Sequence, residues 1–271
     1  MKRLLLPTLV ALAVLAAGGT SAAQGPGKPT GDATVEPVVA GKGSKLTSIL
    51  RGRPDENQTP RGASLKLEQG FKVDRRAILG RCTAAQAGAS DCPADSRVGS
   101  GNASAVLRSL LGDQPLNLEV SVFAADPETG ETLGLFVTIR DPDSGQQSTA
   151  RGAFKPAAAP FGVELLVDPL PQVQNLPPGF SVLLGEARTR FSAKRTVKRT
   201  VRRTVKRKVR DKRTGRVRTV KRRVKRRVKT TYNLIKNPRG CDGAWAAQTS
   251  VRFDDRTDVR DFEINCARGK R

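Results

Sequence analysis

The sequence predicts an all-β protein: an antiparallel β-sandwich that carries a long, protruding, cationic β-hairpin. Three observations support this fold class. Apolar residues alternate with polar ones in many short runs, Gly and Pro separate those runs, and a repeat of Lys, Arg, Thr and Val fills residues 194–229. Many short strands between turn residues are typical of packed antiparallel sheets rather than of an α/β fold.

The first 23 residues have the pattern of a secretory signal peptide. A short basic start precedes an apolar run at 4–17, and the segment 21–23 supplies small residues before a cleavage point. We therefore expect a secreted, extracellular or cell-wall-associated protein with no transmembrane segment after the signal 1–23 is cleaved. Residues 24–44 contain Gly, Pro, Thr and Val without periodicity, which predicts a flexible linker. The remainder, 45–271, is expected to be one sandwich domain.

Alternating runs predict the strands of this domain. The clearest pattern is a hairpin, in which Leu, Val and Ile occupy every second position of 116–122 and of 133–139, with turn residues at 126–130 between them. Only 83–89 and 105–111 have helical character. Further strands are expected at 63–73, 148–154, 161–167, 181–191, 245–253 and 259–266.

The four cysteines predict two disulfides, because an even number of cysteines in an exported chain usually forms a disulfide framework. Three pairings are possible, and we expect the two local ones, Cys82 with Cys92 and Cys241 with Cys266. A zinc site built from all four thiolates is the alternative, but neither pair has the C-x2-C spacing of structural zinc sites. We therefore expect no metal and no other cofactor.

Several short motifs resemble uncharacterised secreted proteins of high-GC actinobacteria. They are CPADSRVG at 92–99, YNL at 232–234, NP at 237–238 and CDGAW at 241–245. The resemblance covers residues 63–266 and implies paired cysteines and a β-rich fold, but it brings no known activity. The basic block at 194–229 is longer and more repetitive than this pattern leads one to expect.

This basic block holds most of the excess positive charge. It contains 21 Lys or Arg and one acid, Asp211, in a chain whose formal net charge is +24. When the block and the two basic residues of the signal peptide are set aside, 26 basic residues remain against 24 acidic ones, so the body is nearly neutral. The β-propensity of Val and Thr favours a hairpin arm at 194–235. A helix is the alternative, but it would stack like charges four residues apart and break at Gly215.

The valines allow two registers for the hairpin. If the turn is centred on Thr214-Gly215, the residue numbers of two directly opposed residues add up to 429, and Val209 lies opposite Val220. If a four-residue loop at 212–215 connects the strands instead, these numbers add up to 427, and the valines become diagonal neighbours. Arginines alternate with the valines, so neither face can enter a core without burying charge. We therefore expect the hairpin to project as an arm.

From the positive charge of the arm we expect a non-enzymatic protein that binds anionic polymers or surfaces, such as cell-wall polymers or nucleic acid. Counterion release carries no sequence information, and no aromatic residue lies within 194–229 to stack on bases, so no sequence-specific nucleic acid is expected. The chain also lacks histidine, which removes the common His-dependent mechanisms. The residues predicted to contact the polyanion are Lys194, Arg195, Lys198, Arg199, Arg202, Arg203, Lys206, Arg207, Arg218, Lys221, Arg222, Arg223, Lys225, Arg226 and Arg227.

Two other functions stay open. A carbohydrate-active hydrolase with paired carboxylates needs no histidine, and Glu119, Glu131, Glu164 and Asp168 lie on or near predicted strands. Alternatively, the protein is a passive structural component of the cell envelope whose basic repeat is a tolerated, solvated expansion. The segment 141–145 offers oxygen ligands for calcium, but its Asp-Pro-Asp-Ser-Gly sequence is first of all a turn.

Overall fold

The computed structural model describes residues 30–109, 112–172, 178–210 and 212–269. The predicted signal peptide and residues 24–29 of the predicted linker lie outside this part of the chain. The described part is mainly antiparallel strand, with one short α-helix and three 3-10 turns, and the all-β prediction is confirmed. None of the helices described is long and apolar enough to cross a membrane.

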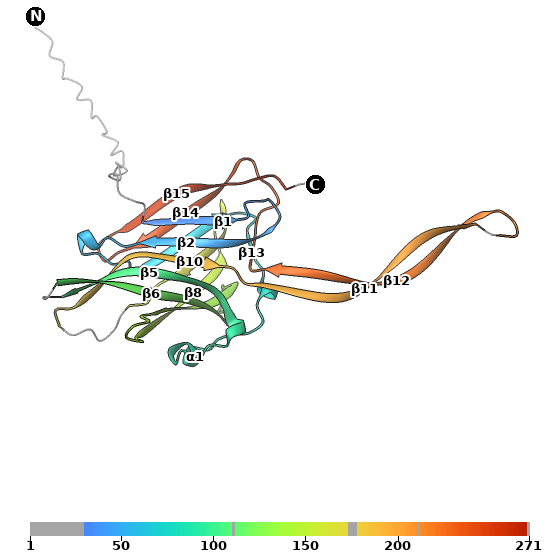
Figure 1. The fold of residues 1–271 in the computed structure, drawn as a ribbon. Coiled ribbons are helices and arrows are strands. Elements are labelled where there is room, and N and C mark those ends of the chain that lie inside the picture. The colour runs from blue at the N-terminus through green and yellow to red at the C-terminus, as the bar shows by residue number, and fades with distance from the viewer. Residues whose placement is uncertain (1–29, 110–111, 173–177, 211, 270–271) are drawn as a thin grey trace, which may run out of the picture.

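Thirteen strands form one continuous sheet, in the order β15-β14-β3-β9-β8-β7-β6-β5-β10-β2-β13-β4, with β1 paired to β2 (Figure 1). The two remaining strands, β11 and β12, form a separate sheet. The elements of the main body are β1 (Gly31–Glu36), β2 (Gly43–Arg51), η1 (Pro54–Glu56), β3 (Gly62–Glu68), β4 (Lys72–Val73), η2 (Arg75–Ala77), α1 (Ala84–Gly88), η3 (Ala94–Ser96), β5 (Arg97–Ser109), β6 (Gly112–Ala125), β7 (Leu133–Arg140), β8 (Gln147–Pro156), β9 (Phe161–Val167), β10 (Ser181–Phe191), β13 (Ile235–Lys236), β14 (Ala244–Arg252) and β15 (Thr257–Asn265).

The sheet curls until β1, which branches from β2 near one end, approaches β14 and β15 at the other end. Strand β1 contacts β14 and β15, and the segment after β1 is tied to the chain beyond β15 by backbone hydrogen bonds. The Ala40 N–H donates to the carbonyl of Ala267 at 3.0 Å, and the Ala267 N–H donates to the carbonyl of Val38 at 2.8 Å. A Cβ at Gly31 would lie 2.6 Å from the Cβ of Thr249, so only glycine permits this approach.

The core lies between the two layers that this curvature creates. In Figure 1, β1, β14 and β15 lie on one side, and β5, β6 and β8 lie on the other. Burial alternates along both layers: Leu118, Val120 and Val122 of β6 are buried, as are Trp245 and Ala247 of β14. The period-two pattern in the sequence therefore marks the face that packs against the opposite layer.

The predicted linker at 24–44 is wrong for its described residues. Residues 31–36 form β1, whose register with β2 runs from Gly31 opposite Leu50 to Glu36 opposite Lys45. Ala33 and Val35 point into the core and are 4% and 2% exposed. Two small apolar residues in a Gly- and Pro-rich segment give a weak periodic signal, and the strand depends on its pairing with β2.

The predicted helix at 105–111 is also wrong for 105–109, and its last two residues lie outside the described chain. Residues 105–109 continue β5, which pairs with β6 on one side and with β10 on the other. Ala and Leu favour helix when a segment is considered alone. Here hydrogen-bonding partners on both edges override that preference, and Ala105 is buried. The other predicted helix, 83–89, is confirmed as α1 with a capping box between Thr83 and Gln86.

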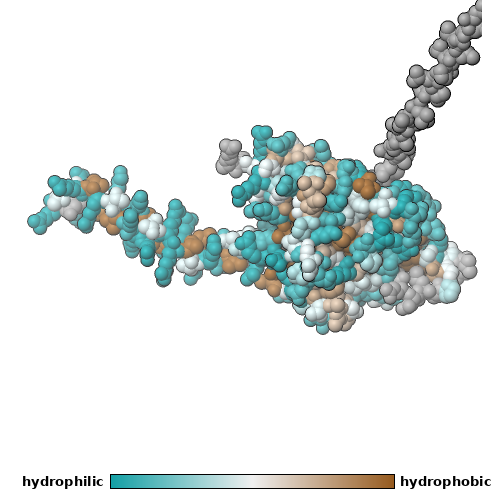
Figure 2. All heavy atoms as spheres, turned by 180° about the vertical axis from the view of Figure 1, so that it is seen from behind, coloured by the Kyte–Doolittle hydropathy of each residue, from teal (hydrophilic) through white to brown (hydrophobic). Residues whose placement is uncertain are grey.

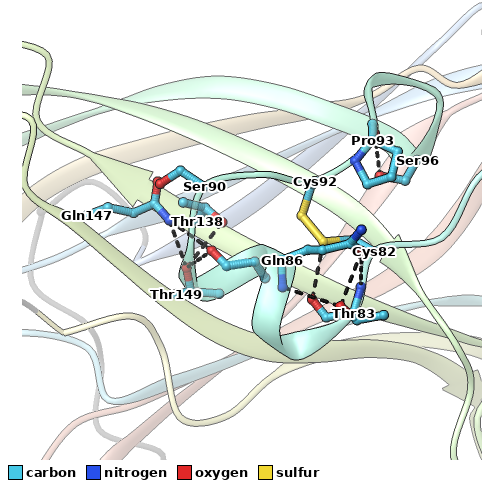
Figure 3. Close-up of a disulfide and its surroundings, with 11 residues drawn as sticks. Cys82, Thr83, Gln86, Ser90, Cys92, Pro93, Ser96, Thr138, Gln147 and Thr149 are labelled. Atoms are coloured by element: carbon cyan, nitrogen blue, oxygen red, sulfur yellow. Dashed lines mark hydrogen bonds between the residues drawn. A yellow bond between two sulfur atoms is a disulfide. The ribbon is translucent and has the colours of Figure 1, made fainter.

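Both predicted disulfides are confirmed: Cys82 pairs with Cys92, and Cys241 pairs with Cys266. The first closes the segment that contains α1, and hydrogen bonds hold this segment to β8 (Figure 3). The Gln147 side-chain amide donates to the Ala87 carbonyl at 2.9 Å, and the Ser90 hydroxyl donates to Gln147 Oε1 at 2.5 Å. The second disulfide joins the chain after β13 to the end of β15.

Removing the second disulfide is expected to destabilise the fold. Cys241 is 8% exposed within the core, and the bond closes a loop with a sequence separation of 25. The double change Cys241→Ser with Cys266→Ser should lower the free energy of unfolding by about 3 kcal/mol, because the unfolded chain regains the entropy of the open loop. Urea denaturation monitored by circular dichroism measures this, and a loss below about 1 kcal/mol would contradict the prediction.

Candidate polyanion-binding arm

Strands β11 (Lys194–Arg210) and β12 (Val217–Asn233) pair antiparallel into a ribbon, which we call the arm. The arm extends away from the sandwich into solvent (Figure 1). Seventeen residues in each strand, at about 3.3 Å per residue, make it about 55 Å long. No strand of the described main sheet pairs with either edge of the arm.

The register of the arm is the one in which partner numbers sum to 427. Val209 lies opposite Arg218, Val205 opposite Arg222, and Arg203 opposite Val224. The alternative with a sum of 429, which places valines directly opposite each other, is wrong. That register would also place Arg207 opposite Arg222, and like charges directly across an antiparallel pair are destabilising. The observed register sets each of these arginines beside a valine instead.

One side of the arm, the valine–arginine face, is a checkerboard of these two residues. Its valines are not buried: Val205, Val209, Val220 and Val224 are 38–44% exposed. Hydrophobic patches therefore alternate with hydrophilic side chains along the arm in Figure 2. The arginines on this face are Arg195, Arg199, Arg203, Arg207, Arg218, Arg222 and Arg226.

The opposite side, the lysine–threonine face, carries like charges directly across the ribbon. Three such pairs follow one another at four-residue intervals: Lys198 with Lys229, Arg202 with Lys225, and Lys206 with Lys221. Threonines lie between them, and the hydroxyls of Thr196 and Thr231 are 3.1 Å apart across the ribbon. Cross-strand repulsion of this kind costs stability, and an anion bound on this face would relieve it.

All fifteen residues predicted to contact a polyanion lie on the arm and are exposed. The prediction omitted Lys208, Arg210 and Lys229, which the structure exposes on the same strands. Their membership of the same repeat was the signal that would have included them. Together, β11 and β12 carry ten and eight Lys or Arg respectively, and no acid. Among the described residues, none of these eighteen forms a salt bridge.

Buried residues at both ends anchor the arm to the sandwich. Phe191, at the end of β10, and Leu234 and Ile235, just after β12, are 1–3% exposed. The Leu234 N–H donates to the Ala193 carbonyl at 2.9 Å and closes the base of the ribbon. At the base of the arm, the guanidinium of Arg76, from η2, lies 4.5 Å from the centre of the Tyr232 ring. The ribbon therefore leaves the body in a defined direction.

Asp74 holds this arginine in place and makes the base of the arm sensitive to acid. The hydrogen bond from the Arg76 side chain lowers the pKa of Asp74, against a smaller opposing effect of burial. A carboxylate whose pKa falls on folding stabilises the protein above its unfolded pKa, about 4, and this stabilisation is lost as the pH falls through the lower folded value. We expect Asp74→Asn to lower the melting temperature more at pH 7 than at pH 3, where part of the stabilisation is already lost. A melting temperature equally lowered at both pH values would contradict this.

Three of the four carboxylates proposed for a hydrolase form ion pairs with basic side chains. Glu131 accepts a hydrogen bond from Arg151 at 2.8 Å, Glu164 lies 3.4 Å from Lys155 Nζ, and Asp168 pairs with Arg252. Glu119 is exposed on β6 at the opposite end of the β6–β7 hairpin from Glu131. The structure therefore does not bring Glu119 and Glu131 together.

The candidate calcium ligands at 141–145 act within their own turn. Asp141 accepts hydrogen bonds from the Asp143 N–H at 3.0 Å and from the Ser144 hydroxyl at 2.5 Å, and these bonds lower the pKa of Asp141. Within the described residues, no cluster of three or more acidic, Cys or His side chains has the geometry to hold a metal ion.

Comparisons with known proteins add no relative from which a role for the arm could be transferred. No protein-family model, curated protein or solved structure matches this chain.

Proposed function

We propose that the protein is secreted and binds polyanions through the arm, without sequence specificity. The observation that carries this proposal is the placement of eighteen Lys and Arg side chains on a solvent-exposed ribbon, where no described carboxylate neutralises them. The ligands that fit are extended anionic molecules: cell-wall polymers, anionic surfaces or nucleic acid.

The spacing of the charges supports an extended ligand. Eighteen cations along about 55 Å amount to one positive charge per about 3 Å. Duplex DNA carries one negative charge per about 3.4 Å on each strand. The eighteen cations lie on both faces of the ribbon, so a linear polyanion lying along the lysine–threonine face would meet eleven of them, about one per 5 Å, and each contact would release bound counterions.

The side chains of the arm favour electrostatic binding without base recognition. Tyr232 is the only aromatic residue on the described strands of the arm, and Arg76 covers it at the base. Base stacking, which single-strand binders use, has no platform along the ribbon. Affinity should therefore depend on charge density and salt rather than on sequence.

The body of the protein supports the assignment of binding to the arm, because many of its own cations are already neutralised. Arg61 is paired with Asp254, Arg151 with Glu131, and Arg256 with Glu56. The proposed location outside the cytoplasm agrees with the two disulfides, which persist in oxidising compartments.

Salt titration tests this function. The chain without residues 1–23 is mixed with fluorescent duplexes of two unrelated sequences, and affinity is measured by anisotropy between 50 and 200 mM NaCl. If the arm contacts six to ten phosphates, affinity should fall about 10³- to 10⁵-fold over this range and should be equal for both duplexes. Weak binding at 50 mM with little salt dependence would favour the passive structural role. A large difference between the two duplexes would overturn the absence of specificity.

A further inference from the structure

A large cavity lies inside the sandwich, between the two layers of the curled sheet. Its volume is about 1280 Å³. Small-molecule sites usually measure about 300 to 1,000 Å³, and close-packed protein interiors contain few voids larger than one water molecule. A cavity of this size is therefore larger than the voids of a packed core and large enough to hold a ligand.

The cavity lies along β10, and we call its end near Phe180, which faces away from the arm, the mouth. Its lining on this side extends from Phe180 to Phe191; Phe191 is buried, and the partly exposed lining residues of β10 run from Ser181 to Thr189, about 26 Å at about 3.3 Å per residue. The arm begins immediately after Phe191. Leu107 of β5, which pairs with Val182 of β10, lines the cavity at the mouth.

The wall of the cavity is aliphatic and incompletely covered. Leu116, Ile139, Val167, Val182 and Leu184 pack against the core cluster, yet all five keep part of their surface exposed. They come from β6, β7, β9 and β10 and line the cavity together. Aliphatic side chains that face an interior but remain accessible leave apolar surface unburied, and an apolar occupant would cover it.

The mouth is polar but offers no unpaired cation among its described residues. Asn57, Thr59 and Ser148 contribute amide and hydroxyl groups. The Thr59 and Ser148 hydroxyls donate to the carbonyls of Val182 and Gln172 and can still accept a hydrogen bond, whereas the Gln147 amide is already bonded to Ala87 and Ser90. Arg61 is the one basic residue that lines the cavity in the described chain, and two hydrogen bonds of 2.7 and 2.8 Å join its guanidinium to Asp254.

The remaining charge at the mouth is acidic. A third bond, of 2.9 Å, joins Arg61 to Gln172 Oε1, and the mouth also includes the carboxylate of Asp141. These groups suit a head group that is uncharged and forms hydrogen bonds, and they disfavour a carboxylate or a phosphate.

We propose that this cavity binds a single-chain lipid with an uncharged hydroxyl or ester head group, of which a monoacylglycerol is the simplest example. The hydrocarbon core of a bilayer, which is two acyl chains deep, is about 30 Å thick. The cavity is therefore long enough to take one complete acyl chain, with the head group held at the amide and hydroxyl groups of the mouth. This site is separate from the arm and does not depend on polyanion binding.

The test measures binding of monooleoylglycerol to the delipidated protein by native mass spectrometry. Two variants each place a bulky ring in the cavity from a different wall, Val182→Trp on β10 and Ile139→Trp on β7. The control is Val259→Trp, on β15, where the side chain is 51% exposed and does not line the cavity. Circular dichroism shows which variants keep the fold.

We expect one monooleoylglycerol per chain, bound at least tenfold more weakly by whichever blocking variant folds and unchanged in the control. Oleate, with the same chain but a carboxylate head, should bind at least tenfold more weakly than monooleoylglycerol. Three results would overturn the proposal: no saturable binding, equal binding by a folded blocking variant, or binding of oleate as tight as that of monooleoylglycerol. A chain without the distal arm should keep full lipid affinity, so failure of one function is distinguishable from failure of the other.

Discussion

Replacing residues 198–229 by Asn-Gly is expected to reduce the affinity for duplex DNA at 50 mM NaCl by at least about a thousandfold. The change leaves Val197 opposite Thr230, as in the native register, and joins them by a two-residue turn that suits a hairpin. It removes all but two of the eighteen cations on β11 and β12. Since each phosphate contact contributes about 0.9 to the slope of log affinity against log salt, the salt dependence should nearly vanish.

A matched variant separates the effect of charge from that of the apolar side chains. Changing Val201, Val205, Val220 and Val224 to threonine keeps every cation and preserves β-propensity. Its affinity and salt slope should remain within about twofold of the original protein. If the shortened arm binds as tightly as the full arm, the arm is not the binding site; if the valine variant loses binding, apolar contacts rather than charge carry it.

Trp245→Ala is expected to cause a large loss in the free energy of unfolding. Trp245 is 1% exposed, its ring meets Phe71 edge to face with centroids 5.2 Å apart, and its Nε1–H donates to the Gly240 carbonyl at 3.0 Å. Removing a buried aromatic ring leaves a cavity and costs about 3–5 kcal/mol. Urea denaturation followed by far-ultraviolet circular dichroism measures this loss, because the chain's one tryptophan is absent from the variant.

The conservative change Trp245→Phe serves as the control for this position. It keeps an aromatic ring against Phe71 but removes the donor to the Gly240 carbonyl, so we expect a loss of about 1–2 kcal/mol. Equal losses for Ala and Phe would show that the hydrogen bond, and not the packing of the ring, stabilises this part of the core. A loss below about 1 kcal/mol for Trp245→Ala would contradict its role in the core.

The strands with strict alternation were the most predictable elements. The expected ranges 161–167 and 181–191 coincide with β9 and β10, and the hairpin expected at 116–122 and 133–139 lies within β6 and β7. In these segments one face is buried and the other is not, so burial appears directly in the order of the side chains. The disulfides were also predictable, because each joins cysteines that are close in sequence.

Elements that depend on distant partners were not predictable in the same way. Strand β1 and the end of β5 carry weak or helical local patterns, and neighbouring strands determine their conformation. The register of the arm was open between two values, since both place the valines on one face. Each register sets some like charges opposite each other, such as Arg207 with Arg222 at a sum of 429 and Arg202 with Lys225 at a sum of 427, so the local sequence did not decide between them.

The sequence by itself determined that the chain forms amphipathic strands, that its cysteines pair locally, and that its positive charge is concentrated in one repeat. Each of these properties follows from residues near one another along the chain. The tertiary structure alone decided that the sheet curls until β1 meets β14, and that a long aliphatic cavity lies within it. Its aliphatic lining comes from strands far apart in the sequence, and the space between them depends on curvature and packing, which local periodicity does not encode.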